Sequence, residues 1–170
     1  MEDNPAPQLL ELLKKQQPWY LIRNVVYILK KRKDPSGIEK FKEIWGYSHI
    51  KVKIEIISYL YTIKCKEWLD YFKEAVLSPI EEMVLLSARM IAKIKWDEAI
   101  QIVIERSKSI PPHKTGSNFH KQLLQFLAKS GNKKAITFIS CLPINVKTFF
   151  PWQKTNLKKY VFELLKEYKK

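Results

Sequence analysis

The sequence predicts an all-α protein, specifically an α-solenoid of about four helical hairpins with capping helices at both ends. Apolar residues recur with a period of 31 residues along helical faces, which is typical of a helical repeat. Only 4 Gly are present, and the 9 Pro fall at segment edges, as expected when helices fill most of the chain. At 170 residues, with 46% hydrophobic residues, the chain can bury a core, and we expect residues 1–170 to form a single domain.

The first expected element is an N-terminal capping helix over residues 6–16, followed by hairpins at about residues 18–48, 49–79 and 80–110. In these three hairpins the first helix repeats its apolar residues in steps of four, and the second helix has them at helical spacing. The aligned first-helix positions are Leu21, Val52 and Met83, then Val25, Ile56 and Ser87, then Leu29, Leu60 and Ile91. The aligned second-helix positions are Ile38, Leu69 and Ile100, then Phe41, Phe72 and Val103.

A fourth hairpin, at about residues 116–140, follows when five residues are inserted around Pro111 and Pro112. The prolines and Gly116 indicate that the insertion is a loop. The apolar positions of this copy are Phe119, Leu123 and Leu127 in the first helix and Ile136 and Ile139 in the second. A capping helix over residues 153–168 ends the stack and aligns Leu157, Val161 and either Leu164 or Leu165.

Residues that favour helix starts stand at the expected boundaries. Asp34 precedes Pro35, which suits an N-cap followed by proline at the first helical position. The segment from Ser78 to Glu81 has the pattern of a capping box, in which the two side chains bond each other's backbone. Asp97 and Asn132 are placed as N-caps of second helices.

The repeat resembles bacterial HEAT-like repeats related to those of phycobilisome lyases, whose unit runs roughly Val-Arg-x-x-Ala-x-x-x-Leu-Gly-x-x-x-Asp. The resemblance covers about residues 18–140, and it implies the solenoid fold but no particular function, because such repeats serve scaffolds, lyases and nucleic-acid enzymes. The Asp of the unit is kept only at Asp34, with Asn132 a near match, and its Arg is reduced to Lys53. The matching residues are Leu21, Val25, Leu29 and Asp34; Val52, Lys53, Ile56, Leu60 and Cys65; and Met83, Ser87, Ile91, Ala92 and Trp96.

The charge of the chain predicts an anionic partner, because a net charge of +14 repels itself unless it meets opposite charge. Residues 1–107 carry 18 Lys and Arg against 15 Asp and Glu, whereas residues 108–170 carry 13 against 2. We therefore expect an acidic protein partner to dock on the C-terminal third. Nucleic acid is the alternative, although Lys outnumbers Arg by 27 to 4 and Arg is favoured for phosphate.

Two groups of residues are candidates for binding. The resemblance places the first helices on the concave side of the solenoid, where positions 2, 6 and 10 of each unit face away from the apolar stripe. None of the twelve residues at these positions is acidic. Four of them, Ile54, Ser58, Thr62 and Leu85, are not candidates for binding. The other eight are the candidate binding residues: Arg23, Tyr27, Lys31, Arg89, Lys93, Lys121, Gln125 and Lys129. The alternative is that these residues form an ordinary solvent-exposed helix face without a binding role. Phe149, Phe150 and Trp152 form a possible docking loop, or they plug the last repeat.

Catalytic constellations are missing from the sequence, so we expect a binding protein without enzymatic activity, metal or cofactor. His49, His113 and His120 have no carboxylate or cysteine partner at motif spacing, and we expect His113 and His120 to lie at the surface. Phosphate-binding glycine loops and metal-ligand clusters are also lacking. The enzymatic alternative is a similarity to DNA alkylation repeat glycosylases, which use an acid and tryptophans on a DNA-facing surface, as Trp96 and Asp97 could.

The remaining features favour a cytoplasmic protein. Apolar runs fall short of the roughly 20 residues that span a bilayer, and the acidic start of the chain does not look like a signal peptide. Two cysteines are too few for a disulfide framework. The oligomeric state and the identity of the partner stay open.

Overall fold

The computed structural model describes residues 6–13, 17–65, 69–145 and 150–168. In these ranges all regular secondary structure is helical, which confirms the prediction of an all-α protein. The helices form two compact units, Met1–Leu69 and Asp70–Lys170. Each unit has its own core, and the expectation of a single domain over residues 1–170 stays a prediction.

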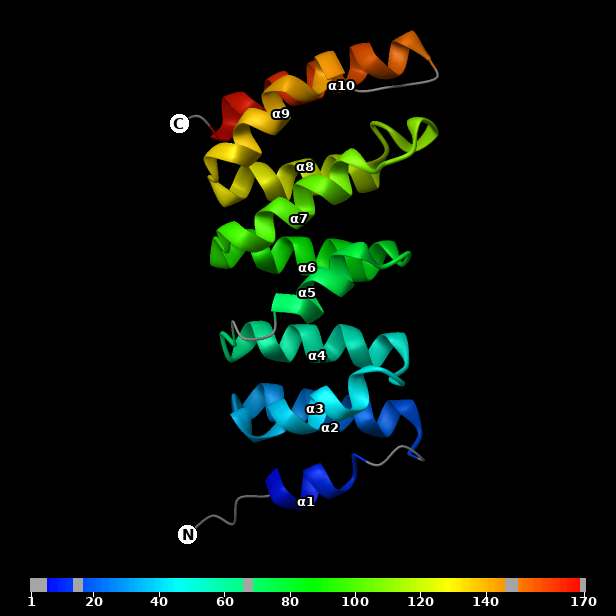
Figure 1. Ribbon diagram of the computed structural model, residues 1–170, viewed down its shortest axis with the longest axis vertical. Helices are drawn as coiled ribbons and strands as arrows, with labels where there is room; N and C mark the ends of the chain where they lie inside the picture. The colour runs from blue at the N-terminus through cyan, green and yellow to red at the C-terminus, as the bar shows by residue number, and fades with distance from the viewer. Residues whose placement is uncertain (1–5, 14–16, 66–68, 146–149, 169–170) are drawn as a thin grey trace. The chain divides into compact units, whose positions relative to one another are not determined.

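Unit 1 contains α1 (Ala6–Glu11), α2 (Trp19–Arg32), the 3-10 turn η1 (Pro35–Gly37), α3 (Ile38–Trp45) and α4 (Ile50–Thr62). Helices α2 and α4 pack along each other, and α1 packs on α2 and η1 (Figure 1). Lys30 on α2 pairs with Glu55 on α4, and the Tyr59 hydroxyl donates to the Asp34 carbonyl at 2.7 Å. The first helices of the first two predicted hairpins are therefore direct neighbours.

Unit 2 contains α6 (Glu81–Ile94), α7 (Asp97–Lys108), the 3-10 turn η2 (Pro112–Lys114), α8 (Asn118–Ser130), α9 (Lys133–Asn145) and α10 (Pro151–Tyr168), preceded by α5 (Leu69–Leu77). Helix α6 packs along α8, whereas α7 and α9 cross them at an angle in Figure 1. Helix α9 contacts both α7 and α8, and α10 contacts both α8 and α9.

Most core positions predicted from the repeat are confirmed by burial. Leu29, Leu60 and Ile91, which occupy one aligned position, are fully buried. Burying a side chain of this size contributes roughly 1.5–3 kcal/mol, so the repeat is where much of the stability lies. Leu21, Ile38, Leu69 and Ile136 are only half-buried. At the C-terminal end Leu164 is buried and Leu165 is half-buried, which decides between the two alignments of α10.

The backbone repeats with the same period as the sequence. Left-handed residues end α2, follow α4 and end α6, at Lys33 (φ 53°), Lys64 (φ 56°) and Lys95 (φ 50°), and Gly131 (φ 67°) ends α8. The first three lie 31 residues apart, and Gly131 comes later by that period plus the five-residue insertion. In each of the first three copies the next residue donates its backbone N–H back into the helix, as in a Schellman cap: Asp34 to Leu29 at 3.0 Å, Cys65 to Leu60 at 3.1 Å and Trp96 to Ile91 at 3.3 Å.

The predicted caps are confirmed at two sites and wrong at two. The Asp34 carboxylate accepts from the Ser36 N–H at 2.9 Å, and the Asn132 side chain accepts from the Ala135 N–H at 3.1 Å. Asp97 is the first residue of α7 and has no capping bond, because its carboxylate accepts from the Asn132 side-chain amide at 2.8 Å.

The predicted capping box between Ser78 and Glu81 does not form. Helix α6 begins at Glu81, and the Ser78 hydroxyl accepts from the Ile80 N–H at 3.1 Å. The Glu81 carboxylate pairs instead with Lys114 of η2 at 3.0 Å. This ion pair attaches the insertion loop to the start of α6.

The two terminal helices differ from their predicted bounds. The N-terminal helix α1 covers Ala6–Glu11 of the predicted 6–16, and residues 14–16 lie outside the described part. The C-terminal helix α10 begins at Pro151 and not at residue 153. Proline suits the first position of a helix because its missing N–H has no helical partner there, and the prediction neglected this preference.

Candidate binding site

Helix α10 presents an exposed strip that mixes aromatic and cationic side chains. Leu157, Val161 and Leu164 are buried against the rest of unit 2. A second set of residues repeats at spacings of three and four, which places it along another face of the helix. All of its members are exposed, and we call them the α10 strip: Trp152, Thr155, Lys159, Phe162 and Lys166. Large exposed aromatic residues are enriched at binding surfaces, so α10 is the first candidate site.

The predicted docking loop is partly described. Phe149 lies outside the described residues. Phe150 and Trp152 are 53% and 60% exposed, and their rings stack with centroids 6.0 Å apart. Trp152 stands in the first turn of α10, so it belongs to a helix and not to a loop. The exposure of Phe150 and Trp152 does not favour the alternative in which the aromatic residues plug the last repeat.

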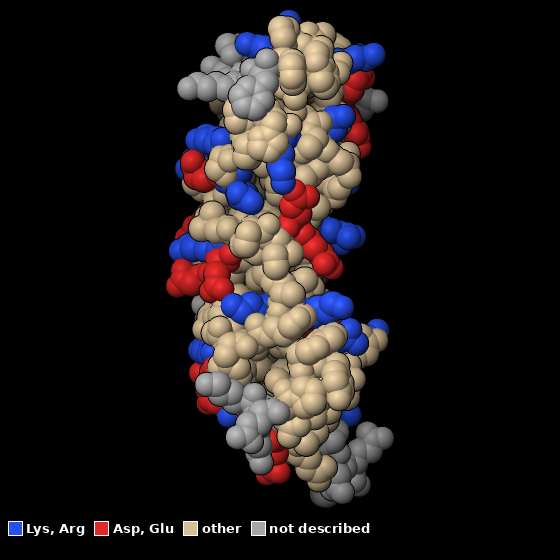
Figure 2. Space-filling view, turned by 90° about the vertical axis from the view of Figure 1, so that its right-hand side faces the viewer, with Lys and Arg blue, Asp and Glu red and all other residues tan. Residues whose placement is uncertain are grey.

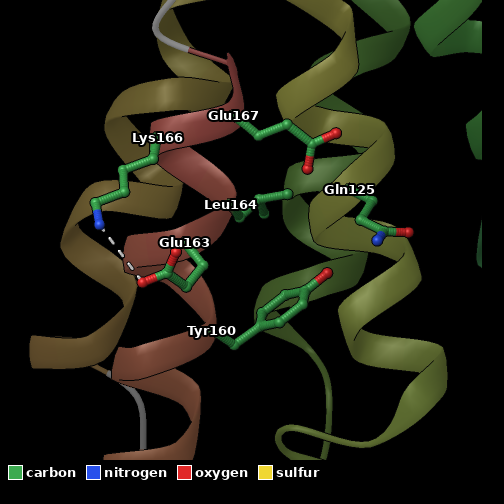
Figure 3. A pocket seen from close by; sticks show the side chains of 6 residues that line it. All are labelled: Gln125, Tyr160, Glu163, Leu164, Lys166 and Glu167. Atoms are coloured by element: carbon green, nitrogen blue, oxygen red, sulfur yellow. Dashed lines mark ion pairs between the residues drawn. The ribbon is translucent and has the colours of Figure 1, made fainter.

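One side of α10 faces α8 across a hollow of about 650 Å³, which we call the α8–α10 hollow (Figure 3). The Tyr160 hydroxyl donates to the Lys121 backbone carbonyl at 3.0 Å, and the Lys121 ammonium lies 5.4 Å from the centre of the ring. Burial, followed by the nearby Tyr168 and Glu167, raises the pKa of the Tyr160 phenol. The polar groups of this side are therefore largely occupied by one another.

Carboxylates also line the α8–α10 hollow. Figure 3 shows Glu167 extending toward Gln125 on α8, while Glu163 turns toward Lys166, which lies 3.7 Å away. If Leu157 is taken as the start of a fifth first helix, then Lys159, Glu163 and Glu167 occupy positions 2, 6 and 10. The predicted acid-free lining thus does not extend to α10.

The other side of α10 faces α9 across a groove of about 620 Å³ between Ser140 and residues 155–165, which we call the α9–α10 groove. Its apolar surface comes from Val161, Phe162 and Leu165, and Phe162 is 59% exposed. Lys158 and Lys159 stand at its edge. Among the described residues that line this groove, none is acidic.

In unit 1 the predicted concave-face residues are engaged with their neighbours. Arg23 lies 5.9 Å from the Trp19 ring and donates to the Asn24 side chain at 3.3 Å. Tyr27 is exposed, and the ammonium groups of Lys30 and Lys31 lie 5.1 and 5.5 Å from its ring. The Lys30–Glu55 pair sets a carboxylate beside this surface, which reduces its positive charge.

In unit 2 the predicted residues fall into two groups. Arg89 and Lys93 on α6 and Lys129 on α8 are exposed, and they have no acidic partner among the described residues. Lys121 and Gln125 are half-buried beside α10, and Gln125 lines the α8–α10 hollow. The structure therefore brings Lys121 and Gln125 together with α10.

On one face of the protein, basic side chains lie in separate groups. On the face drawn in Figure 2, Lys and Arg side chains alternate with Asp and Glu side chains and with wide uncharged areas. On this face the positive charge of the C-terminal third is therefore divided among separate side chains and does not form one continuous basic patch.

His120 was expected at the surface, and the structure places it in the interior with 1% exposure. It lies in the first turn of α8, where its Nδ1 accepts from the Gly116 N–H at 3.1 Å. The buried Nε2 has no hydrogen-bond partner among the described residues. Burial lowers the pKa of His120 to about 4, so the ring is neutral at physiological pH. The helical pattern could have predicted this burial, because His120 precedes the buried positions 123, 124 and 127 by three, four and seven.

Residues with possible catalytic roles have structural partners. Trp96 is buried and meets the Phe72 ring edge-on at 5.7 Å, and Asp97 bonds Asn132 between α7 and α9. These contacts do not favour the glycosylase alternative. The described residues include no group of three or more His, Cys, Asp or Glu side chains that could hold a metal ion. Among the described helices, none has the length and apolar character needed to cross a membrane.

In comparisons with known proteins, no family model and no curated protein matches the chain. The candidate site therefore has to be interpreted from its own geometry.

Proposed function

We propose that this chain is an α-solenoid of about four HEAT-like hairpins that acts as a non-catalytic interaction module for an acidic protein partner. The repeated left-handed caps support the solenoid, because they give each first helix the same ending at the period of the sequence repeat. The direct packing of α2 on α4, and of α6 on α8, is also what stacked hairpins require.

The observation that carries the binding role is the α10 strip. Trp152 and Phe162 expose more than half of their surface, and Lys159 and Lys166 lie between and beyond them on the same face. Full burial of such a side chain contributes roughly 1.5–3 kcal/mol, and an aromatic residue exposed to this extent lacks more than half of that stabilisation. A partner that covers the strip recovers this free energy, and the lysines select for negative charge.

The binding role is tested by selecting displayed random peptides on the full chain and by measuring duplex and single-stranded DNA and RNA binding over a salt series. The proposal expects enriched peptides rich in Asp and Glu, whose binding weakens when Lys159→Glu is introduced. Nucleic-acid binding with a steep log–log salt dependence, without any enriched peptide, would overturn it in favour of a nucleic-acid function.

The solenoid is tested separately by small-angle X-ray scattering. A compact protein of this length has a radius of gyration of about 15 Å. Stacked hairpins predict a clearly larger value and an asymmetric distance distribution. A value near that of a compact protein would contradict the solenoid while leaving the binding role untouched.

A further inference from the structure

Within unit 2 a third helix fills the groove between α7 and α8 and also the groove between α8 and α9, whereas the groove between α9 and α10 is not filled by any described helix. Helix α9 packs against both α7 and α8. It contributes Ala135, Ile139 and Leu142, which are buried and repeat at spacings of four and three. Helix α10 packs in the same way against both α8 and α9. Helices α9 and α10 then form the α9–α10 groove, and no helix among the described residues fills it.

The open groove has the apolar surface that a further helix needs. Val161 is buried at its base, Leu165 is half-buried, and Phe162 projects with more than half of its surface exposed. Residues 155–165 extend over about 15 Å of helix, which corresponds to about three turns of a helix lying alongside. The geometry favours a helical occupant with apolar residues at i, i+4 and i+7, the pattern by which α9 itself is buried.

The charges at the edge of the groove favour an occupant whose polar face is acidic. Lys158 and Lys159 stand at its edge, and neither has an acidic partner among the described residues. The described residues that line the groove include no acid, so an acidic ligand meets only positive charge there. We infer that the α9–α10 groove binds an acidic amphipathic helix, whose apolar side covers Phe162 and whose carboxylates pair with Lys158 and Lys159. This inference rests on the proposed function and names the site and partner chemistry.

Two other occupants fit less well. A second copy of this chain would bring its own Lys158 and Lys159 against those of the first, and each chain carries a net charge of +14. A nucleic acid would stack a base on an exposed ring, but the Lys166 ammonium lies 4.4 Å from the centre of the Phe162 ring. Phosphates would also lie over the apolar side chains of Val161 and Leu165.

The test is calorimetric titration of the full chain with a synthetic peptide of about 16 residues, a little over about four helical turns, with Leu at i, i+4, i+7 and i+11 and Glu at most other positions. The expected result is micromolar binding, lost by about tenfold or more on Phe162→Ser and by about thirtyfold on Lys158→Glu with Lys159→Glu. A peptide with Gln in place of Glu is expected to bind at least about tenfold more weakly. Thermal unfolding of each variant checks that it folds, which we expect because all three side chains are exposed.

The matched control is Lys133→Glu with Lys134→Glu in the first turn of α9, which changes the net charge by the same amount at two exposed residues that do not line the groove. The inference expects this control to keep the affinity of the wild type within about threefold. Equal losses in the control and the α10 variant, or no binding of the acidic peptide to the wild type, would overturn the groove as the site. Displayed peptides that bind Phe162→Ser as well as the wild type would also overturn it, while the proposed interaction function would stand. Dimerisation that depends on Phe162, measured by analytical ultracentrifugation, would instead assign the groove to a second copy.

Discussion

The two sides of α10 differ in whether their polar and charged side chains already have partners. On the α8 side, Tyr160 donates to a backbone carbonyl, Lys121 lies over its ring, and Glu163 faces Lys166. On the α9 side, Lys158 and Lys159 border an exposed Phe162. Neither lysine forms an ion pair among the described residues, although Glu163 lies one turn from Lys159. On the α8 side most of these polar groups are thus paired, whereas on the α9 side the two lysines have no ion-pair partner among the described residues.

This difference separates a structural surface from a binding surface better than net charge does. Both sides belong to the same basic third of the chain, and both are hollowed to a similar volume. A hollow whose hydrogen bonds and charges are already paired gains little from a ligand, because the ligand must displace existing partners. When a ligand binds in an apolar groove bordered by unpaired lysines, apolar surface is buried and new ion pairs form. The comparison predicts that changes on the α8 side alter stability and changes on the α9 side alter binding.

The largest expected effect on stability concerns α8, which supports the hollow and carries the buried His120. Because the pKa of His120 is lowered to about 4 from its ordinary 6.5, the unfolded chain binds a proton in this range that the folded chain does not. The free energy of unfolding is therefore highest above pH 6.5 and falls as the pH is lowered toward 4. The contribution of His120 to this decrease is roughly 3 kcal/mol. Protonation at Nδ1 would also remove the acceptor for the Gly116 N–H.

Urea unfolding at about pH 7 and about pH 4.5 measures this loss. His120→Asn, which retains an acceptor near the Nδ1 position, is expected to have a flatter pH dependence. His113→Gln is the control, because His113 is exposed and its replacement should leave the dependence unchanged. Equal slopes for the wild type and His120→Asn would show that His120 is not the source.

A smaller effect is expected from Tyr160→Phe on the α8 side. The change removes the hydrogen bond to the Lys121 carbonyl and costs about 1 kcal/mol, which lowers the melting temperature by about 2–4 °C. Calorimetric unfolding checks the stability, and titration with the acidic peptide should give an unchanged affinity. A loss of peptide affinity in this variant would break the separation between the two sides.

The smallest effect is expected from Glu163→Gln. The ion pair with Lys166 spans 3.7 Å between side chains that are about 60% exposed, and such pairs contribute below about 0.5 kcal/mol. Thermal unfolding should therefore barely change at low salt. Peptide affinity should rise by less than about threefold, because a negative charge near the α10 strip is removed. A destabilisation above about 1 kcal/mol would mean that the pair is structural.

Much of the fold could be predicted because the repeat consists of apolar residues at regular helical spacing. Leu29, Leu60 and Ile91 align in the sequence, and each is buried at the equivalent position of its own helix. The capping errors came from side chains with two available partners. Asp97 and Glu81 were expected to bond their own helices, and they bond Asn132 and Lys114 on distant segments instead. Spacing along one helix cannot decide such a competition.

The candidate site was predictable only in part. The aromatic character of Trp152 was recognised, but Phe162 and the neighbouring Lys158 and Lys159 were not singled out. A helical projection of α10 would have shown Phe162 outside the buried stripe of Leu157, Val161 and Leu164. The groove itself could not be predicted, because it depends on how α9 packs beside α10.

The most direct test of the central claim is a charge exchange between the α9–α10 groove and its peptide. The full chain with Lys158→Glu and Lys159→Glu is titrated with the acidic peptide and with a version that carries Lys in place of Glu. The account predicts that the variant loses the acidic peptide and gains the lysine peptide, each by at least about tenfold relative to the wild type. A variant that binds both peptides as the wild type does would contradict it.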